Sequence, residues 1–310
     1  MACERCRGEE RVVLPYGPHK FCNEHFLEFF EKRVKKTLTK FRLVRQGDRI
    51  LVGVSGGKDS TCTAYLLHNI FPKGYDIQAV LVDEGIKGRK DRAVRLAKKN
   101  LDSWGMPYNV FSFREEYGVT MDEIGAKLEK NMELGTPCSF CGVLKRALIN
   151  RKAKEMGFGK VATGHNLDDH AQSVLMNVFD NDLRRMAGLG PSSGEGELGG
   201  LVPRIKILYE CPENEVEMYM KLKGIRYDDK PCPLRWEAKR NHYRRILDET
   251  EGRYPGSKYS VLGTLEQMRP LLKGLASGSG KLGKCGKCGA PSSRKMCMVC
   301  EKLAMLSRSL

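Results

Sequence analysis

The chain has 310 residues, with 54 Lys or Arg against 38 Asp or Glu, so its formal net charge is +16 at pH 7. This length allows a substantial buried core and predicts roughly two domains with small appendages. No run of about 18 apolar residues is present and the start, MACERCRGEE, lacks a signal-peptide pattern, so we expect no membrane span and a cytoplasmic location. The positive charge favours a polyanionic partner such as RNA, although a solvated basic surface would have the same composition.

The chain begins with a metal-ligand pattern. Cys3 and Cys6 form one close pair, and Cys22 and His25 form another after fifteen intervening residues. Four soft ligands in two pairs suit a tetrahedral structural zinc, and the metal would replace the core that about 25 residues cannot build. If His25 were only a surface histidine, three cysteines and a water would remain. Residues 26–41 then show helical apolar spacing with a basic opposite face, which suits either solvent or an RNA backbone.

The stretch ILVGVSGGKDS, residues 50–60, joins an apolar strand to a glycine-rich turn and a helix start. Gly56 and Gly57 permit a tight loop, and N–H groups at the start of the helix form a site for phosphate or pyrophosphate. The spacing is not that of the Walker P-loop. It resembles the PP-loop of the ATP pyrophosphatase superfamily, whose members cleave ATP between the α- and β-phosphates. An ordinary Gly-Gly turn is the alternative.

Strands and helices alternate after this loop. An apolar run at 77–82 ends in Asp83, a helix is expected over about 90–101, and a strand is expected near 109–113. The predicted fold class is therefore α/β, with a doubly wound, mainly parallel sheet. Ligands of such sheets collect outside the carboxyl ends of the strands, so the loop at Asp83 should face the glycine-rich loop across a nucleotide crevice.

Two cysteines in the middle of the chain lie directly before a predicted helix. The segment TPCSFCGVLKR contains Cys138 and Cys141, with Lys145 one turn further on, and the helix should end near residue 156. Thiolates are favoured at a helix N-terminus, and the basic side chains can direct positive charge toward the same crevice. A second zinc pair is the alternative, but no partner pair lies at the usual spacing. Cys232, between two prolines, is the one prominent cysteine left over.

The segment KVATGHNLDDH, residues 160–170, is predicted to be another strand, loop and helix start. Asp168 and Asp169 in the first turn suit the helix dipole, and they either hold Mg²⁺ with ATP phosphates or simply cap the helix. His165 and His170 are candidate general bases.

The rest of the chain is predicted to be mainly helical before a second metal-ligand pattern. We expect a loop at 188–200, a last core strand at 204–208, helices at 212–223, 235–248 and 262–272, and a flexible linker at 276–284. The pairs Cys285 with Cys288 and Cys297 with Cys300 then predict a zinc ribbon or knuckle. The last two cysteines, Cys62 and Cys211, are expected to be small buried side chains. The predicted domains are a zinc finger at 1–27, a catalytic domain with basic RNA-binding helices at 28–275, and a linker with a second zinc finger at 276–310.

Together these motifs resemble the tRNA 2-thiouridine synthetases of the PP-loop superfamily. The matching segments are SGGKDS at 55–60, PCSFCGVLKR at 137–146, ATGHNLDD at 162–169, PCPLR at 231–235 and the zinc patterns at both ends. The resemblance covers nearly the whole chain. It extends to the branch that thiolates a T-loop uridine and to the branch that thiolates the wobble uridine. The sequences CGVLKR and ATGHNLDD resemble the T-loop branch slightly more, without selecting between the two branches.

The resemblance implies an ATP-dependent tRNA-uridine 2-sulfurtransferase. The uridine C2 oxygen would attack ATP to give an adenylated base and pyrophosphate, and sulfur would then displace AMP. A [4Fe-4S] cluster held by Cys138, Cys141 and Cys232 would leave one iron open for hydrosulfide. The implied partners are tRNA, a sulfur donor that is either a ubiquitin-like thiocarboxylated protein or free sulfide, and a second copy of the chain in a homodimer. ATP with Mg²⁺ and two structural zinc ions complete the implied cofactors.

The resemblance also implies roles for individual residues. Lys145 would stabilise charge on the α-phosphate, and Asp169 would hold Mg²⁺ or act in catalytic positioning. Asp83 and Gly164 would approach the adenosine. The remaining ATP-binding residues would be Gly53, Val54, Ser55, Gly56, Gly57, Lys58, Asp59 and Ser60.

Other functions fit parts of the same pattern. Without a cluster, Cys138 or Cys232 would carry a persulfide and another cysteine would resolve it as a disulfide. A zinc-dependent RNA-binding scaffold with an inactive nucleotide fold would use the zinc modules and the basic helices. A tRNA cytidine thiolase or a lysidine synthetase would share the PP-loop, but the terminal zinc patterns disfavour both by resemblance.

Overall fold

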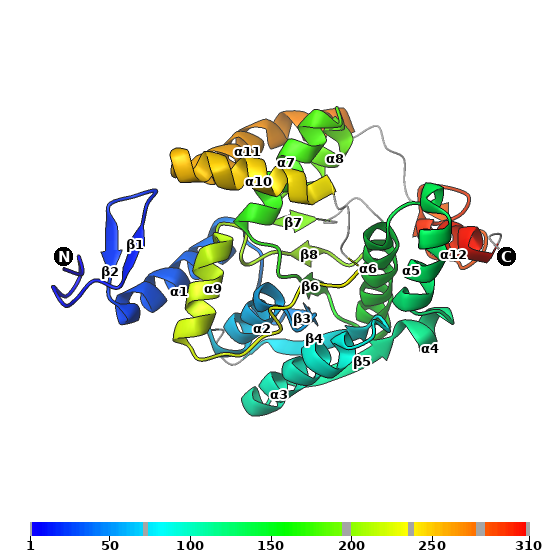
Figure 1. Ribbon diagram of the computed structural model, residues 1–310, viewed down its shortest axis with the longest axis horizontal. Helices are drawn as coiled ribbons and strands as arrows, with labels where there is room; N and C mark the ends of the chain where they lie inside the picture. Colours follow the sequence, from blue (N-terminus) through cyan, green and yellow to red (C-terminus); the bar gives the residue numbers. More distant parts are fainter. Residues whose placement is uncertain (1, 71–73, 194–199, 235–238, 277–282, 308–310) are drawn as a thin grey trace.

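A six-stranded sheet with the order β5-β4-β3-β6-β8-β7 forms the centre of the protein in the computed structural model (Figure 1). The structure describes residues 2–70, 74–193, 200–234, 239–276 and 283–307. The strands are β3 (Arg49–Val54), β4 (Asp76–Asp83), β5 (Tyr108–Ser112), β6 (Lys160–Ala162), β7 (Ser192–Ser193) and β8 (Arg204–Ile205). The first five strands in the sheet order are parallel and β7 is an antiparallel edge. The predicted doubly wound α/β fold is therefore confirmed.

Helices cover both faces of the sheet, which explains why β3 and β4 are apolar runs. Ile50 and Val52 pack on one face in the large core, whereas Leu51 packs on the other, because successive side chains of a strand point to opposite faces. The first face is covered by α1 (Asn23–Lys40), α2 (Lys58–Ile70), α3 (Arg95–Trp104) and α9 (Glu213–Leu222), and the second by α6 (Pro137–Glu155). A π-helical turn, Lys90–Val94, precedes α3.

Four more helices pack against one another beside the β7 edge of the sheet (Figure 1). They are α7 (Leu167–Phe179), α8 (Leu183–Ala187), α10 (Lys239–Arg253) and α11 (Ser257–Ala276). On the other side of the molecule, α4 (Phe113–Tyr117), α5 (Met121–Lys130) and a 3₁₀ turn, Met132–Leu134, connect β5 to α6. The sequence reasoning had no helix in this connection. The capping box of Thr120 and Glu123 at the start of α5 is the signal that would have indicated one.

Two small modules lie at opposite ends of the molecule (Figure 1). The N-terminal module is the hairpin of β1 (Val12–Leu14) and β2 (His19–Phe21) with the start of α1, and α1 continues unbroken across the boundary predicted after residue 27. The C-terminal module contains β9 (Gly283–Lys284), β10 (Pro291–Ser292) and α12 (Met298–Ser307), which packs on α6. Phe21 belongs to the main core and Leu306 to the core around α6, so both modules are attached by apolar packing.

The other predicted elements are present with shifted ends, apart from the strand predicted at 204–208. That strand is wrong beyond residue 205, because the chain turns there, with the Tyr209 N–H donating to the Lys206 carbonyl at 3.3 Å and the Cys211 N–H to the Leu208 carbonyl at 2.9 Å. Four predicted features lie partly outside the described residues: the PCPLR segment at Arg235, the helix at 235–248 in its residues 235–238, the loop at 188–200 in its residues 194–199, and the linker in its residues 277–282. Among the described helices, none combines the length and apolarity that a membrane crossing needs.

Candidate active site

The glycine-rich loop and the loop after β6 lie side by side at the carboxyl edge of the sheet. In the strand order, β3 lies between β4 and β6, so the chain leaves β3 toward one side of the sheet and later returns on the other. Such a switch point is where open α/β sheets bind ligands. The two loops approach so closely that a Cβ on Gly164 would lie 2.6 Å from the Ser60 backbone nitrogen. Only glycine fits at this position.

The glycine-rich loop is held by hydrogen bonds from its own side chains. Ser60 Oγ accepts from the Ser55 N–H at 3.0 Å, lies 3.0 Å from Ser55 Oγ and donates to the Gly57 carbonyl at 3.1 Å. Gly56 has a φ of +83°, and a Cβ there would lie 2.3 Å from the Ala93 carbonyl oxygen. Helix α2 begins at Lys58, so the N–H groups of its first turn face a preformed loop, the geometry of an anion site.

A cavity of about 610 Å³ lies over this edge of the sheet. Its walls come from the glycine-rich loop, the loop after β6, the start of α7, the N-terminal half of α6, and α10. Of the residues predicted for catalysis and ATP binding, those that line it are Gly53, Val54, Ser55, Gly57, Asp59, Ser60, Cys138, Cys141, Lys145, Gly164 and Asp169. Phosphate-binding backbone, thiols, a lysine and a carboxylate therefore meet in one space.

Two predicted ATP-binding side chains are engaged elsewhere. Lys58 Nζ donates to Glu213 at 2.6 Å and to Asp59 at 3.1 Å, so it borders the loop without lining the cavity. Asp83 Oδ1 accepts from the Gly85 N–H at 3.0 Å and lines a separate cavity of about 500 Å³. Its position fits the formation of the turn after β4, and the next residue, rather than Asp83, faces the candidate site.

That next residue, Glu84, is a site residue that the sequence reasoning missed. Its side chain is buried and hydrogen-bonded to Lys145 Nζ, and Arg89 lies 3.9 Å from its other oxygen. Burial lowers the pKa of Lys145, but the Glu84 carboxylate more than offsets this and raises the pKa above its usual value. Lys145 therefore carries a full positive charge inside the cavity at neutral pH.

The adjacent aspartates at the start of α7 point in different directions. Asp169 lines the cavity, where its Oδ1 lies 3.1 Å from Arg240 Nη1, and it forms a capping box with Asn166. Asp168 turns away, is only 4% exposed, and accepts from Lys258 Nζ at 2.5 Å. Of the two, only Asp169 is placed to meet a nucleotide or its metal ion, and the same side chain also caps the helix.

Helix α10 contributes two arginines to the cavity, Arg240 and Arg244. Arg244 Nη1 donates to Glu213 at 2.8 Å, so Glu213 joins α10 to Lys58 of the glycine-rich loop. The basic character of this helix is visible in the sequence, where the basic helices of residues 28–275 are predicted to bind RNA. Which of its arginines face the nucleotide crevice depends on packing against α7 and could not be read from their spacing.

The two histidines considered as general bases differ in position. His165 lines the cavity, and burial lowers its pKa although the Asp169 carboxylate acts in the opposite direction. His170 is 3% exposed, packs its ring edge-on against Tyr209 at 4.5 Å, and does not line the cavity. Burial lowers its pKa well below the usual value. Only His165 is therefore positioned as a neutral proton acceptor toward the site.

The three central cysteines gather around the N-terminus of α6. Cys138 and Cys141 line the cavity, and Cys232 lies among the side chains of the core beside α6. Burial raises the pKa of Cys141, Lys145 acts in the opposite direction, and both Cys232 and Cys138 are near enough to add to the rise. The sulfur atoms of these three residues do not all lie within 4.8 Å of one another, a spacing that among the described residues only other groups reach. Their spacing is wider than that of a single tetrahedral ion.

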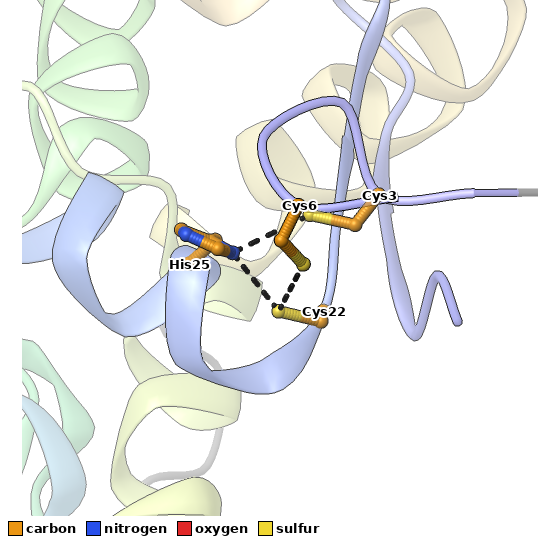
Figure 2. Close-up of side chains that lie close together, drawn as sticks. All are labelled: Cys3, Cys6, Cys22 and His25. Carbon is orange, nitrogen blue, oxygen red and sulfur yellow. Dashed lines mark hydrogen bonds between the residues drawn. The ribbon is translucent and has the colours of Figure 1, made fainter. Parts of the chain in front are cut away.

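Both terminal cysteine groups do have that tight spacing. Cys3, Cys6, Cys22 and His25 point toward one another (Figure 2), as do Cys285, Cys288, Cys297 and Cys300, and within each group all ligand atoms lie within 4.8 Å. Tetrahedral zinc with Zn–S bonds of about 2.3 Å requires sulfur atoms about 3.8 Å apart. The Sγ atoms of Cys6 and Cys22 are 3.9 Å apart, and those of Cys288 and Cys297 are 3.6 Å apart. His25 Nδ1 lies 3.2 Å from Cys22 Sγ, so the histidine completes the first set.

Comparisons with known proteins point to one group. The PP-loop domain family matches residues 27–250. The tRNA-5-methyluridine(54) 2-sulfurtransferase of Pyrococcus horikoshii is 33% identical, over 97% of this chain and 93% of its own length. The cytoplasmic tRNA 2-thiolation protein 1 of Drosophila ananassae is 34% identical, over 99% of this chain and 88% of its own length. The solved structure of the U34-tRNA thiolase NcsA from Methanococcus maripaludis with its [4Fe-4S] cluster is similar with a TM-score of 0.82 at 31% identity, covering 99% of this chain and 96% of that one.

Proposed function

This chain belongs to the PP-loop family of tRNA 2-thiolation enzymes, and we propose that it adenylates the C2 oxygen of a tRNA uridine and replaces that oxygen with sulfur. The observation that carries the proposal is the shared cavity, in which the phosphate-binding loop, Lys145, Asp169 and two cysteine thiols face one another. Activation of a base and delivery of sulfur to it need these groups within the length of one nucleotide. We also propose that residues 28–275 form the catalytic domain, with zinc modules at 1–27 and 276–310.

In the adenylation step, the residues of the chain act on ATP and the uridine. The loop from Ser55 to Ser60 binds the β- and γ-phosphates through the N–H groups at the start of α2. The uridine C2 oxygen attacks the α-phosphorus and pyrophosphate leaves, while the charge that develops on the α-phosphate is stabilised by Lys145. Asp169 binds the Mg²⁺ that accompanies ATP. Gly164 lets the adenosine lie close to the loop backbone.

In the second step, hydrosulfide adds to C2 of the adenylated base and AMP leaves with the former C2 oxygen. Cys138, Cys141 and Cys232 are the ligands that we propose for a [4Fe-4S] cluster. Two of these thiols line the cavity, the third lies in the core beside α6, and the three are spaced more widely than the ligands of one zinc ion. When bound, such a cluster would supply a Lewis-acidic iron that activates hydrosulfide as a nucleophile. Lys145 contributes positive charge next to Cys141 and so opposes the rise that burial produces in the pKa of that thiol.

The same proposal extends to the remaining cofactors and partners. The ligand geometry at both ends supports two structural zinc ions, which would stabilise modules too small to fold on a core of their own. The sulfur donor is proposed to be a thiocarboxylated ubiquitin-like protein or sulfide, and the enzyme is proposed to act as a homodimer in the cytoplasm. Light scattering of the purified protein tests the dimer, and a thiolation assay supplied with either donor tests the source of sulfur.

The central test replaces Cys232 with Ala and assays thiolation and iron content anaerobically. We expect both to fall, while Cys211→Ala, which changes a buried cysteine outside the cavity, keeps both. Retained thiolation with normal iron would overturn the three-cysteine cluster. Thiolation by anaerobically purified protein that contains no iron would instead favour a persulfide on Cys138 or Cys232. ATP-dependent release of pyrophosphate with unmodified tRNA would rule out the alternative of a zinc-dependent RNA-binding scaffold with an inactive nucleotide fold.

The target uridine is a separate question, because one similar protein is named for U54 and another for U34. Nucleoside mass spectrometry of tRNA from a deletion strain decides it. Loss of a T-loop thiouridine would place this chain with the first, and loss of a wobble thiouridine would place it with the second.

A further inference from the structure

A second cavity, of about 890 Å³, lies between α6 and the C-terminal module. Arg146 lines both this cavity and the 610 Å³ cavity of the candidate active site, so the two spaces meet at its side chain. The wall on the α6 side includes Val143 and Ala147, and the opposite wall includes Val299 and Leu303 of α12. The ring of Tyr117 adds an aromatic surface. Apolar surface therefore leads from the C-terminal module toward the reacting centre.

The positive charges in this second cavity are not all neutralised. Arg151 is paired with Glu116 at 2.5 Å, and Arg294 is paired with Glu301 at 3.1 Å. In contrast, the side chains of Arg146, Lys154 and Arg204 form no hydrogen bond and no ion pair with any other described residue of the chain. The cavity thus presents three cations that lack a counterion within the described structure.

Two of these cations lie close enough to repel each other. Burial lowers the pKa of Arg204, and the positive charge of Arg146 lowers it further. Burial also lowers the pKa of Arg146; nearby Cys141 acts in the opposite direction and Arg240 adds to the lowering. Arginine stays protonated under such conditions, so an anion between the two side chains would relieve the repulsion. A phosphate group between the two guanidinium groups would accept bidentate hydrogen bonds from either.

On the premise of the proposed function, we propose that the second cavity binds the RNA strand next to the target uridine, with Arg146 and Arg204 holding a backbone phosphate. Single-stranded nucleic acid is bound by grooves that combine cations for the phosphates with apolar and aromatic surfaces for the bases, which is the composition of this cavity. Arg146 also lines the cavity of the candidate active site, so a phosphate bound to it would lie next to the space that we propose for ATP. The strand would therefore enter along α12 and deliver its uridine to the active site.

The test measures tRNA affinity of the full-length, zinc-loaded protein by fluorescence anisotropy over a range of salt concentrations. Arg204→Gln should weaken binding by about tenfold, the cost of one charged hydrogen-bonding contact. It should also reduce the slope of log Kd against log salt by about 0.7 to 0.9, because one fewer counterion is released. Arg204→Lys, which keeps the charge, should recover most of the affinity and the slope.

Arg114→Gln is the matched control, since Arg114 is an exposed arginine that is paired with Glu123 and lies outside this cavity. It should change neither the affinity nor the salt slope. Thermal midpoint and zinc content of each variant establish that the fold is intact. If Arg204→Gln is folded and binds tRNA with the affinity and slope of the unchanged protein, the proposal is refuted.

Two further outcomes separate this proposal from others. If Arg204→Gln leaves tRNA binding unchanged but weakens thiolation from a thiocarboxylated protein donor and not from sulfide, the cavity binds the donor and the RNA proposal is overturned. If tRNA binding depends on Arg204 while the unchanged protein makes no thiouridine under any donor, the cavity assignment holds and the proposed function fails.

Discussion

Substitutions at the neighbouring residues Asp168 and Asp169 give the sharpest test of the site. In the structure the first side chain forms a buried ion pair, whereas the second faces the cavity. The Asp168 side chain is 6% exposed and is paired with the Lys258 side chain, which is 13% exposed. It also accepts from the Glu213 N–H at 2.7 Å, so it ties the start of α7 to α9 and α11. The Asp169 side chain is 25% exposed, faces the cavity and is paired with Arg240, which is 35% exposed.

The expected loss of stability for Asp168→Asn follows from the burial of its ion pair. Removing one partner of a buried pair costs about 3–5 kcal/mol. The lower end, about 3 kcal/mol, applies here because Lys258 keeps a second carboxylate, Asp248, at 2.6 Å. At about 2 °C per kcal/mol for a chain of this size, the thermal midpoint should fall by about 6 °C. Activity at 25 °C should persist.

Asp169→Asn should have the opposite result. Its partly exposed ion pair contributes about 1 kcal/mol at most, and the amide oxygen can still accept from the Asn166 N–H, so the midpoint should move by about 2 °C or less. Pyrophosphate release with tRNA and ATP should fall by about 100-fold or more, because a charge at the reacting phosphates is lost. Glu249→Gln, on the exposed surface of α10, is the control for both. An unchanged midpoint with lost activity for Asp168→Asn would refute the assignment.

Three further predictions concern single contacts. Glu84→Gln removes the carboxylate that raises the pKa of Lys145, so burial will lower that pKa. The alkaline limb of the pH–rate profile should therefore move to lower pH. A limb at the same pH would contradict the pairing of Glu84 with Lys145. Gly164→Ala places a Cβ 2.6 Å from the Ser60 nitrogen, which costs about 1–3 kcal/mol of strain. The variant should therefore bind ATP about tenfold more weakly, or weaker still, as measured by calorimetry. A normal affinity would show that the two loops can move apart. Cys300→Ser should remove one equivalent of zinc, measured by mass spectrometry, and lower the thermal midpoint, with the N-terminal zinc kept; full zinc content would exclude Cys300 as a ligand.

The metal-ligand groups and the phosphate loop could be predicted because their residues are close in the sequence. Cys285 and Cys288 lie on one turn, and a strand followed by Gly-Gly and a helix start can form little else than a tight loop. The contacts of Glu84 and Arg240 could not be predicted in this way. Glu84 reaches Lys145 across sixty-one positions, and Arg240 reaches Asp169 across seventy-one, so only the packing of α6 and α10 brings them into the site.

By itself, the sequence determined the alternation of strands and helices after the phosphate loop, the loop itself and both zinc patterns, although it missed α4 and α5. Each of these predicted features depends on apolar period, backbone freedom or ligand spacing within a short segment. Only the tertiary structure decided which adjacent aspartate faces the cavity. It also showed that Asp83 forms a turn whereas Glu84 holds Lys145, and that Arg146 and Arg204 meet without a counterion among the described residues. These results depend on the direction of a side chain from its helix or strand and on segments far apart in the chain. Both are fixed when the helices pack on the sheet.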